Sequence, residues 1–436
     1  MRTAAKVRQP KASGGTAAAS EVIACHECGT VHRLPPMPDD TVARCRACGA
    51  TISIRFDHSV QRTLALYLAA LALIGVANAF PIMTMSIEGQ RNAATILDSA
   101  RALYGEGMWP LAIAVGLAGI VMPLIKIVGM IAVLLPMQLG WRPAWLVAGF
   151  RLVEKVQTWA MMEVYLLGVI VAYVKLQDLA TIHLGVALVA FICTILLLAA
   201  ADAKFDPHAI WRRLAPQAGT DVLVDRPGTR LIACEQCDQV VRVVADHAHG
   251  QACPRCGTGL HHRKPDSLNR TAALVLAAAI LYIPANLLPV LTVISFGRGA
   301  PSTIVGGVIE LVQADMLPVA LLVLFASVVV PVLKLVGLTF LLVSVQRHWT
   351  ARLRDRTRLY RIIEGIGRWS MVDVFMTGIL AALVALGNLA TISAGAGAVA
   401  FCAVVIVTIL ASMSFDPRLM WDAADERVHG RRPLRV

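Results

Sequence analysis

Eight long apolar runs limit the fold of this chain more than any other feature of its sequence. A membrane-spanning helix needs about 20 apolar residues to cross a hydrocarbon core of about 30 Å. Runs of that length lie near 63–85, 109–137, 156–175, 180–201, 271–294, 316–345, 369–387 and 390–412. With 57% hydrophobic residues and a mean hydropathy of +0.67, the composition excludes a soluble globular protein. The sequence predicts an all-α polytopic membrane protein with eight helices.

The second half of the sequence repeats the first. Over the first two apolar runs of each half the offset is 208 residues, so that Pro123, Lys126 and Gly129 return as Pro331, Lys334 and Gly337. Beyond a basic loop the offset becomes 210, and Trp159 returns as Trp369. Such self-similarity indicates two tandem repeats of four transmembrane helices. Because four crossings return the chain to the same side, we expect two parallel halves related by an axis along the membrane normal.

Eight cysteines form two sets of paired Cys-x-x-Cys motifs, one ahead of each group of four helices. The sets are Cys25, Cys28, Cys45 and Cys48, and Cys234, Cys237, Cys253 and Cys256. Four thiolates suit tetrahedral zinc, and paired knuckles with this spacing are a common way to deliver them. Each module has only about 40 residues, so a bound metal would supply its folding energy. We expect two structural Zn²⁺ sites in zinc-ribbon-like modules.

Two other interpretations of the cysteines remain. Iron in a rubredoxin-like site uses the same ligand set and is less favoured. A membrane thiol redox protein or sensor is disfavoured by the pairing of the motifs and by the side of the membrane inferred for them. Cys193 and Cys402 lie in apolar runs, where we expect them to be packing residues.

The net charge of +12 reflects topology rather than nucleic-acid binding. Seven arginines lie between Arg347 and Arg368, and a smaller basic group occupies the matching loop of the first half. Excess Lys and Arg marks the cytoplasmic side, which places both termini and both cysteine modules there. The first 60 residues contain no secretory signal peptide, and residues 1–20 have the composition of a disordered segment.

Two lysines lie deep within apolar runs, where a charge costs about 2.5–3.5 kcal/mol on insertion scales. Counting residues to the end of each run places Lys126 and Lys334 at depths similar to those of Glu163 and Asp373. We therefore expect Lys126 to lie near Glu163, and Lys334 near Asp373. Thr408 is a further polar candidate, with Leu198 at the matching position. The alternative is that these pairs only fix helix packing.

A proline three residues before each lysine removes a backbone hydrogen bond and leaves the carbonyl of Gly119 or Ser327 without its usual donor. Such a bend allows a helix to open around a polar cavity. Asn78 and Asn286 precede Pro81 and Pro289 near the outer ends of their helices, and we count both among the candidate transport residues.

These motifs together resemble the paraquat-inducible protein A family, which includes lipid-transport subunits of the LetA type. The resemblance rests on paired knuckles, Asn-x-x-Pro, Pro-x-x-Lys and Phe-Asp-Pro, each present twice between Glu21 and Trp421. It implies a bacterial inner-membrane protein that works with a periplasm-spanning MCE-domain protein and exchanges phospholipid with it. By this analogy Lys334, Asp373 and Thr408 are the leading transport residues, and the zinc modules are structural or regulatory.

The expected domains follow from these patterns. They are a disordered N-terminus (1–20), a zinc module (21–58), four helices (59–212), a linker (213–228), a second zinc module (229–265), four more helices (266–421) and a basic tail (422–436). The sequence has no P-loop and no hydrolase signature, so we expect no enzymatic activity. Lipid transport is the favoured function. The alternatives are a membrane scaffold that only anchors the partner and a thiol redox protein.

Overall fold

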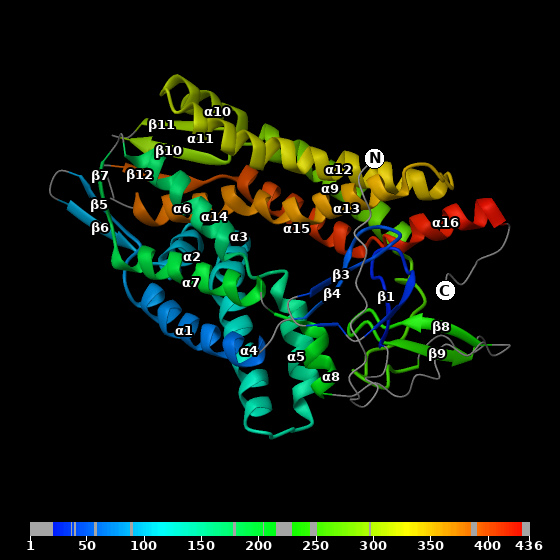
Figure 1. The fold of residues 1–436 in the computed structure, drawn as a ribbon. Helices are drawn as coiled ribbons and strands as arrows, with labels where there is room; N and C mark the ends of the chain where they lie inside the picture. The colour runs from blue at the N-terminus through cyan, green and yellow to red at the C-terminus, as the bar shows by residue number, and fades with distance from the viewer. Residues whose placement is uncertain are drawn as a thin grey trace, which may run out of the picture.

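The computed structural model describes residues 21–35, 37–38, 41–55, 59–87, 90–177, 180–203, 205–214, 229–244, 251–295, 298–384 and 390–429. The expected disordered N-terminus and most of the expected linker lie outside these residues. Within them, eight helices are long and apolar enough to cross a membrane, which confirms the predicted number. They run between an end that carries small β-sheets, called here the sheet end, and an end that carries the cysteine modules, called the module end (Figure 1).

Four of the eight spans are single helices and four are composite. The single helices are α1 (Ser59–Ala79), α7 (Val186–Ala203), α9 (Ser267–Leu287) and α15 (Ala396–Ser414). The composite spans of the first half are α3 (Trp109–Gly116) with η1 (Leu117–Val121) and α4 (Met122–Gln138), then α5 (Trp145–Gln157) with α6 (Met162–Leu176). Those of the second half are α11 (Leu317–Leu324) with η4 (Phe325–Val329) and α12 (Val330–Gln346), then α13 (Leu353–Ile366) with η5 (Gly367–Met371) and α14 (Val372–Leu383).

Two three-stranded antiparallel sheets form the sheet end and correct the all-α prediction. Strand order is β6-β5-β7 in the first half and β11-β10-β12 in the second. Their bounds are β5 (Met83–Ile87), β6 (Gln90–Ala94), β7 (Thr181–Leu184), β10 (Leu291–Ser295), β11 (Arg298–Ser302) and β12 (Ala390–Ala394). Segments such as Met83-Thr-Met-Ser-Ile87 are apolar enough to extend a predicted span, but their alternation and β-branched residues favour a strand. Four predicted spans were therefore too long at this end.

Short helices follow each sheet and each Phe-Asp-Pro motif. Thr95 and Thr303 are the N-caps of α2 (Ile96–Gly105) and α10 (Ile304–Gln313), which explains why Thr-Ile occurs at both places. Asp206 and Asp416 accept backbone N–H bonds at the starts of α8 (Pro207–Leu214) and α16 (Arg418–His429). The last helix therefore continues past the expected domain boundary at 421.

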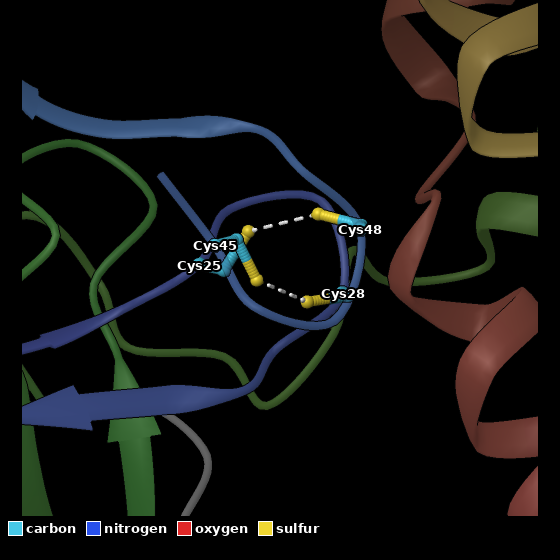
Figure 2. A group of neighbouring side chains, drawn as sticks. All are labelled: Cys25, Cys28, Cys45 and Cys48. Atoms are coloured by element: carbon cyan, nitrogen blue, oxygen red, sulfur yellow. Dashed lines mark hydrogen bonds between the residues drawn. The ribbon is translucent and has the colours of Figure 1, made fainter. Parts of the chain in front are cut away.

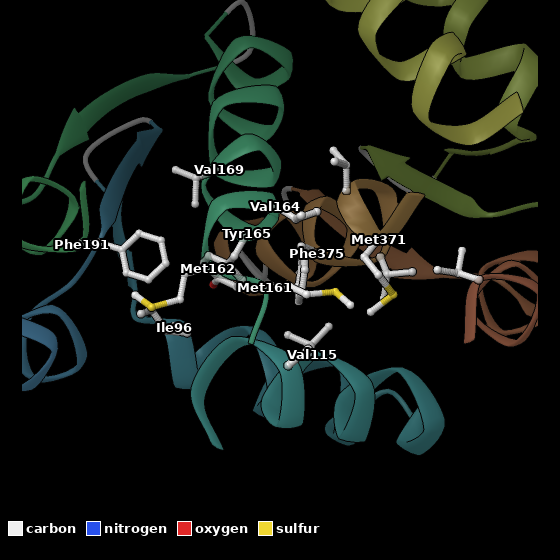
Figure 3. Packing of buried hydrophobic residues seen from close by; sticks show 14 of the residues in the cluster. Ile96, Val115, Met161, Met162, Val164, Tyr165, Val169, Phe191, Met371 and Phe375 are labelled. Atoms are coloured by element: carbon white, nitrogen blue, oxygen red, sulfur yellow. The ribbon is translucent and has the colours of Figure 1, made fainter. Parts of the chain in front are cut away.

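Helices α6 and α14 pack against each other where the two halves meet. A Cβ at Gly168 would lie 3.0 Å from Cβ of Phe375, so glycine permits this close approach. Tyr165 and Phe375 contact edge to face with ring centroids 5.2 Å apart. Figure 3 shows these two rings with Met161 and Met371 around them. The apolar core is therefore continuous from one half to the other.

Each cysteine module docks on helices of the opposite half, and module 2 also contacts its own half through the ion pairs Glu235–Arg418 and Arg263–Asp422. Module 1 contains β1 (Glu21–Ala24), β2 (Val31–Leu34), β3 (Thr41–Arg44) and β4 (Thr51–Arg55); module 2 contains β8 (Thr229–Ala233) and β9 (Val240–Val244). Arg361 of α13 donates to the carbonyl of Cys48 (3.3 Å) and pairs with Glu27. At the matching position of α5, Arg151 donates to the carbonyl of Cys256 (3.4 Å). The same arginine contact thus occurs twice, with the modules exchanged between the halves.

Candidate functional site

Lys334 is buried in the middle of the second half, with 1% of its surface exposed. Its Nζ donates to Oγ1 of Thr408 on α15 (3.0 Å) and to Oγ of Ser370 on η5 (3.4 Å). The sequence predicted Thr408 as a site residue, and the structure places it against Lys334. Ser370 was not predicted. The internal repeat could have identified it, because Ser370 is a hydroxyl residue at the position that matches Ala160 of the first half.

Asp373 lies in the same buried polar region, on the first turn of α14. Oγ of Ser327 lies within hydrogen-bond distance of its Oδ2 and of the carbonyl oxygen of Val323, and the two acceptors share one hydroxyl proton. The other carboxylate oxygen, Oδ1, is buried and has no hydrogen-bond partner among the described residues. A buried polar atom without a hydrogen-bond partner lowers the stability of the fold, and packing alone does not require one.

The helix that carries Lys334 widens just before it. Pro331 has no N–H, and its ring crowds the carbonyl of residue 327. The chain responds with a π-helical turn, Phe325–Val329, rather than an open break. The first half has the same turn, Leu117–Val121, ahead of Pro123. Such turns occur often at functional sites because they turn side chains out of the regular helical register.

We expected Lys334 to lie near Asp373, and the two side chains form no ion pair. Within the described ranges no carboxylate lies within ion-pair distance of Lys334, whose partners are hydroxyl groups. A buried charge without a counter-charge is strongly disfavoured, so the alternative of an ion pair that only fixes helix packing does not describe this site.

The predicted pairing of Lys126 with Glu163 is wrong. Nζ of Lys126 lies 2.6 Å from Oδ2 of Asp202, near the end of α7, and Tyr67 donates to Oδ1 of the same carboxylate (3.0 Å). Glu163 is exposed on the first turn of α6. The prediction failed because depth along a helix does not fix the direction in which a side chain points. In addition, Asp202 lies one residue beyond the predicted span 180–201, so it was not considered as a partner.

The two halves differ in polarity at matching positions. Ser327, Ser370 and Thr408 replace Gly119, Ala160 and Leu198, whereas Ser412 stands where the first half has Asp202. The second half therefore gains hydroxyl groups around its lysine and loses the carboxylate that neutralises the lysine of the first half. Asn78 and Asn286 belong to neither cluster, because each side chain donates to a carbonyl of its own helix, on Ile74 and Tyr282.

The eight predicted cysteine ligands form two buried clusters (Figure 2 shows the first). The closest sulfur separations are 3.5 Å for Cys25–Cys48 and 3.4 Å for Cys28–Cys45. In the second cluster they are 3.4 Å for Cys234–Cys256 and 3.7 Å for Cys237–Cys253. Four sulfurs bound at about 2.3 Å to a tetrahedral metal lie about 3.8 Å apart. The donor set therefore fits a metal ion in each module.

The knuckle turns and thiols are arranged for metal binding. Gly29, Gly49 and Gly257 have positive φ, and Asp238 takes the same conformation at the fourth knuckle. Hydrogen bonds among the thiols of module 1 lower the pKa of Cys28 to about 4 and raise the pKa of Cys25. In module 2 such bonds lower the pKa of Cys253 to about 6 and raise the pKa of Cys237. His32 lies 3.2 Å from the sulfur of Cys45, outside the four-sulfur cluster.

Comparison with known proteins agrees with this geometry. A family model described as paraquat-inducible protein A matches residues 60–215 and again residues 268–425. The chain belongs to the paraquat-inducible protein A family. The two matches of the paraquat-inducible protein A model cover the helices of both halves and leave the cysteine modules outside.

Several curated relatives align along almost the whole chain. "Intermembrane transport protein PqiA" of Escherichia coli K12 is 32% identical over 94% of this chain and 98% of its own length. "Lipophilic envelope-spanning tunnel protein A" of the same strain is 31% identical over 92% and 91%. A "Probable intermembrane transport protein" of Haemophilus influenzae is 28% identical over 93% and 97%. These names describe transport or tunnel proteins and not enzymes. No solved structure matches the chain.

Proposed function

We propose that this chain is the inner-membrane subunit of a bacterial intermembrane lipid transport system. It passes phospholipid to, or receives it from, a periplasm-spanning MCE-domain protein. The proposal is supported by the relatives named as intermembrane transport and envelope-spanning tunnel proteins, each aligned over more than nine-tenths of this chain. The observation that carries the mechanism is the buried Lys334, bonded to Ser370 and Thr408 and unneutralised among the described residues.

The cluster of Lys334, Asp373, Ser327, Ser370 and Thr408 is the proposed transport site. Lysine changes protonation readily when it is desolvated, and Asp373 keeps one oxygen free for a further partner. A polar group that enters between α12, α14 and α15 would find donors and an acceptor already in place. The π turn before Pro331 is the segment we expect to change shape as the site opens.

We further propose that the chain is built from two tandem repeats with the domain boundaries expected above, the last moved from 421 to 429 to include all of α16, and that each cysteine module holds one zinc ion on the cytoplasmic side. The arginines of α13 and of the loop before it lie at the module end, which supports this orientation. Each site would use four thiolates and leave no position for a substrate. When bound, the metal crosslinks the two knuckles of its module.

Substitutions in the polar cluster test the transport proposal. We expect Lys334→Met, Asp373→Asn and Thr408→Val to abolish transfer of fluorescent phospholipid between the purified chain in nanodiscs and its MCE partner. Thr339→Val is the matched control, because Thr339 is exposed on the same helix as Lys334 and bonds only to the carbonyl of Leu335. If all three variants fold and transfer lipid normally, the chain is a scaffold for its partner and the transport proposal fails.

Metal analysis of the same preparations tests the modules. Two zinc ions per chain support the structural interpretation, whereas metal-free chains with disulfides within the cysteine sets would favour the redox alternative.

A further inference from the structure

A polar cavity of about 360 Å³ lies between the two halves at the module end. Its walls come from the end of α5 in the first half and from α13, η5 and the end of α15 in the second. The volume is within the range of about 300–1,000 Å³ that is typical of small-molecule sites. Its charged lining consists of Glu154, Arg361, Glu364 and Arg368.

The cavity is bounded by matching segments of the two halves. Under the 210-residue offset, Glu154 corresponds to Glu364 and Thr158 to Arg368, and all four line the cavity. The second half adds a cation where the first half has a neutral hydroxyl residue. The cavity therefore has opposite charges on one wall, that of α13 and η5.

Two of the four charged groups are already engaged and two are not. Arg361 pairs with Glu27, and Glu154 accepts from Trp211 (3.2 Å) and from Gln236 (2.5 Å). Among the residues that the structure describes, neither Glu364 nor Arg368 forms a hydrogen bond or an ion pair of 4.0 Å or less, and the charges of Arg368 and Lys264 act on Glu364 from farther away. A carboxylate and a guanidinium, one helical turn apart on one wall, are thus both available to a ligand that carries both charges.

Gly367 separates this cavity from the buried lysine. It lines the cavity, and a Cβ at this position would lie 3.0 Å from Cε and 3.4 Å from Nζ of Lys334. The first half has Gln157 at the matching position. Gly367 therefore contacts both the cavity and the side chain of Lys334.

We propose that this cavity binds a phosphodiester that carries a primary ammonium, the polar group of phosphatidylethanolamine. Arg368 binds the phosphate through charge-assisted hydrogen bonds, and Glu364 accepts from the ammonium. Ile409 and Met413 of α15 supply the apolar part of the wall, and Met413 is 37% exposed. The lipid source of this group rests on the proposed function, whereas glycerophosphoethanolamine offers the same chemistry in water-soluble form.

Native mass spectrometry of the full chain, delipidated in detergent, tests the site. The probes are dioleoyl phosphatidylethanolamine and dioleoyl phosphatidylglycerol. We expect Glu364→Gln to lower the affinity for phosphatidylethanolamine about tenfold, as expected for loss of one charge-assisted hydrogen bond, and to leave phosphatidylglycerol unchanged. Arg368→Ala should weaken both lipids, and Arg368→Lys should restore part of the loss.

Matched controls lie on the same helix. Asp355 and Arg358 are exposed, at 61% and 68% of their side-chain surface, and lie outside the cavity. Asp355→Asn and Arg358→Ala should bind both lipids as the unmodified chain does. Unchanged phosphatidylethanolamine affinity in both Glu364→Gln and Arg368→Ala overturns the proposal.

Two further comparisons complete the test. One distinguishes the lipid headgroup from the soluble compound as the ligand, and the other distinguishes this proposal from the transport proposal. Displacement of phosphatidylethanolamine by an equal concentration of glycerophosphoethanolamine assigns the site to the soluble compound; retention of the lipid assigns it to the headgroup. If the three variants of the polar cluster all transfer lipid normally while Glu364→Gln and Arg368→Ala bind phosphatidylethanolamine weakly, the transport proposal fails and the site stands. If those three variants abolish transfer while Glu364→Gln and Arg368→Ala bind phosphatidylethanolamine as the unmodified chain does, only the site proposal fails.

Discussion

Lys126 on α4 and Asp202 at the end of α7 form an ion pair of 2.6 Å that fixes three helices of the first half together. The lysine is buried, whereas the carboxylate is about one-third exposed and also accepts from Tyr67 of α1. Removing one partner leaves the other charge uncompensated, which is far more harmful than replacing both.

We therefore expect Asp202→Ala to lower the free energy of unfolding by about 2–4 kcal/mol, a value reduced from that of a fully buried pair because Asp202 is partly exposed. Glu163→Ala should change it by less than about 0.5 kcal/mol, because Glu163 is exposed. Denaturation of both variants in detergent micelles measures the difference. A larger effect for Glu163→Ala would contradict the assignment of partners.

Gly337 permits α12 to approach α13 closely. A Cβ at this position would overlap Cδ1 of Ile363 and lie 3.3 Å from its Cγ1. We expect Gly337→Ala to destabilise the protein by about 1–2 kcal/mol, since overpacking outweighs the gain in helix propensity. Gly75→Ala is the control, because nothing lies within 4 Å of a Cβ there. It should leave the thermal midpoint unchanged or raise it; equal midpoints for the two variants would show that the contact yields without strain.

Cys28 is a proposed ligand of the first zinc ion and not of the second. We expect Cys28→Ser to reduce the zinc content from two ions per chain to one and to expose β1–β4 to trypsin, because a module of this size depends on metal for its fold. Cys193→Ser should retain both ions, since Cys193 lies on α7 outside the clusters. Elemental analysis after desalting gives the content. Loss of both ions in Cys28→Ser would mean that the two sites are not independent.

Asp416 links the end of α15 to Arg418. Burial raises the pKa of its carboxyl, but the hydrogen bonds and charge of Arg418 outweigh burial and hold the pKa below its ordinary value. This pairing therefore stabilises the fold above the unfolded pKa of about 3.9, and the contribution disappears as pH falls through the folded pKa.

Without the guanidinium, burial would raise the pKa of Asp416 above its ordinary value. We expect the loss of unfolding free energy in Arg418→Ala to be largest at neutral pH and to shrink as pH falls from about 6 to about 3. Denaturant titrations at a series of pH values measure this gap, with Arg358→Ala as the control. A gap that stays constant with pH would contradict the proposed link.

The sequence predicted the parts of this structure that depend on local chemistry. Apolar length identified the eight spans, and cysteine spacing identified both clusters, because each signal is contained within a short segment. The internal comparison also identified Thr408 as a polar candidate, because a hydroxyl residue stands there where the first half has Leu198 in an apolar helix. Its contact with Lys334 was not predicted.

What the sequence could not predict depends on how distant segments meet. The predicted partner of Lys126 was wrong because depth in the membrane is a one-dimensional measure, whereas Asp202 approaches from a helix two spans along. The strands at the sheet end were read as helix because hydropathy does not distinguish the two in short segments. The sequence of neither module indicates which half the module docks on, since a linker allows a module to reach either half.

The exchanged docking of the cysteine modules has a consequence for shorter forms of the chain. A fragment ending at Leu214 would contain Arg151 of α5 but not the knuckle of module 2 that Arg151 contacts. It would contain module 1 but not Arg361, which contacts that module. Such a fragment satisfies both contacts by associating with a second copy, each lending its module to the other. A half-length chain of this architecture is therefore expected to need a second copy of itself, whereas in the full chain both arginine contacts form within one molecule.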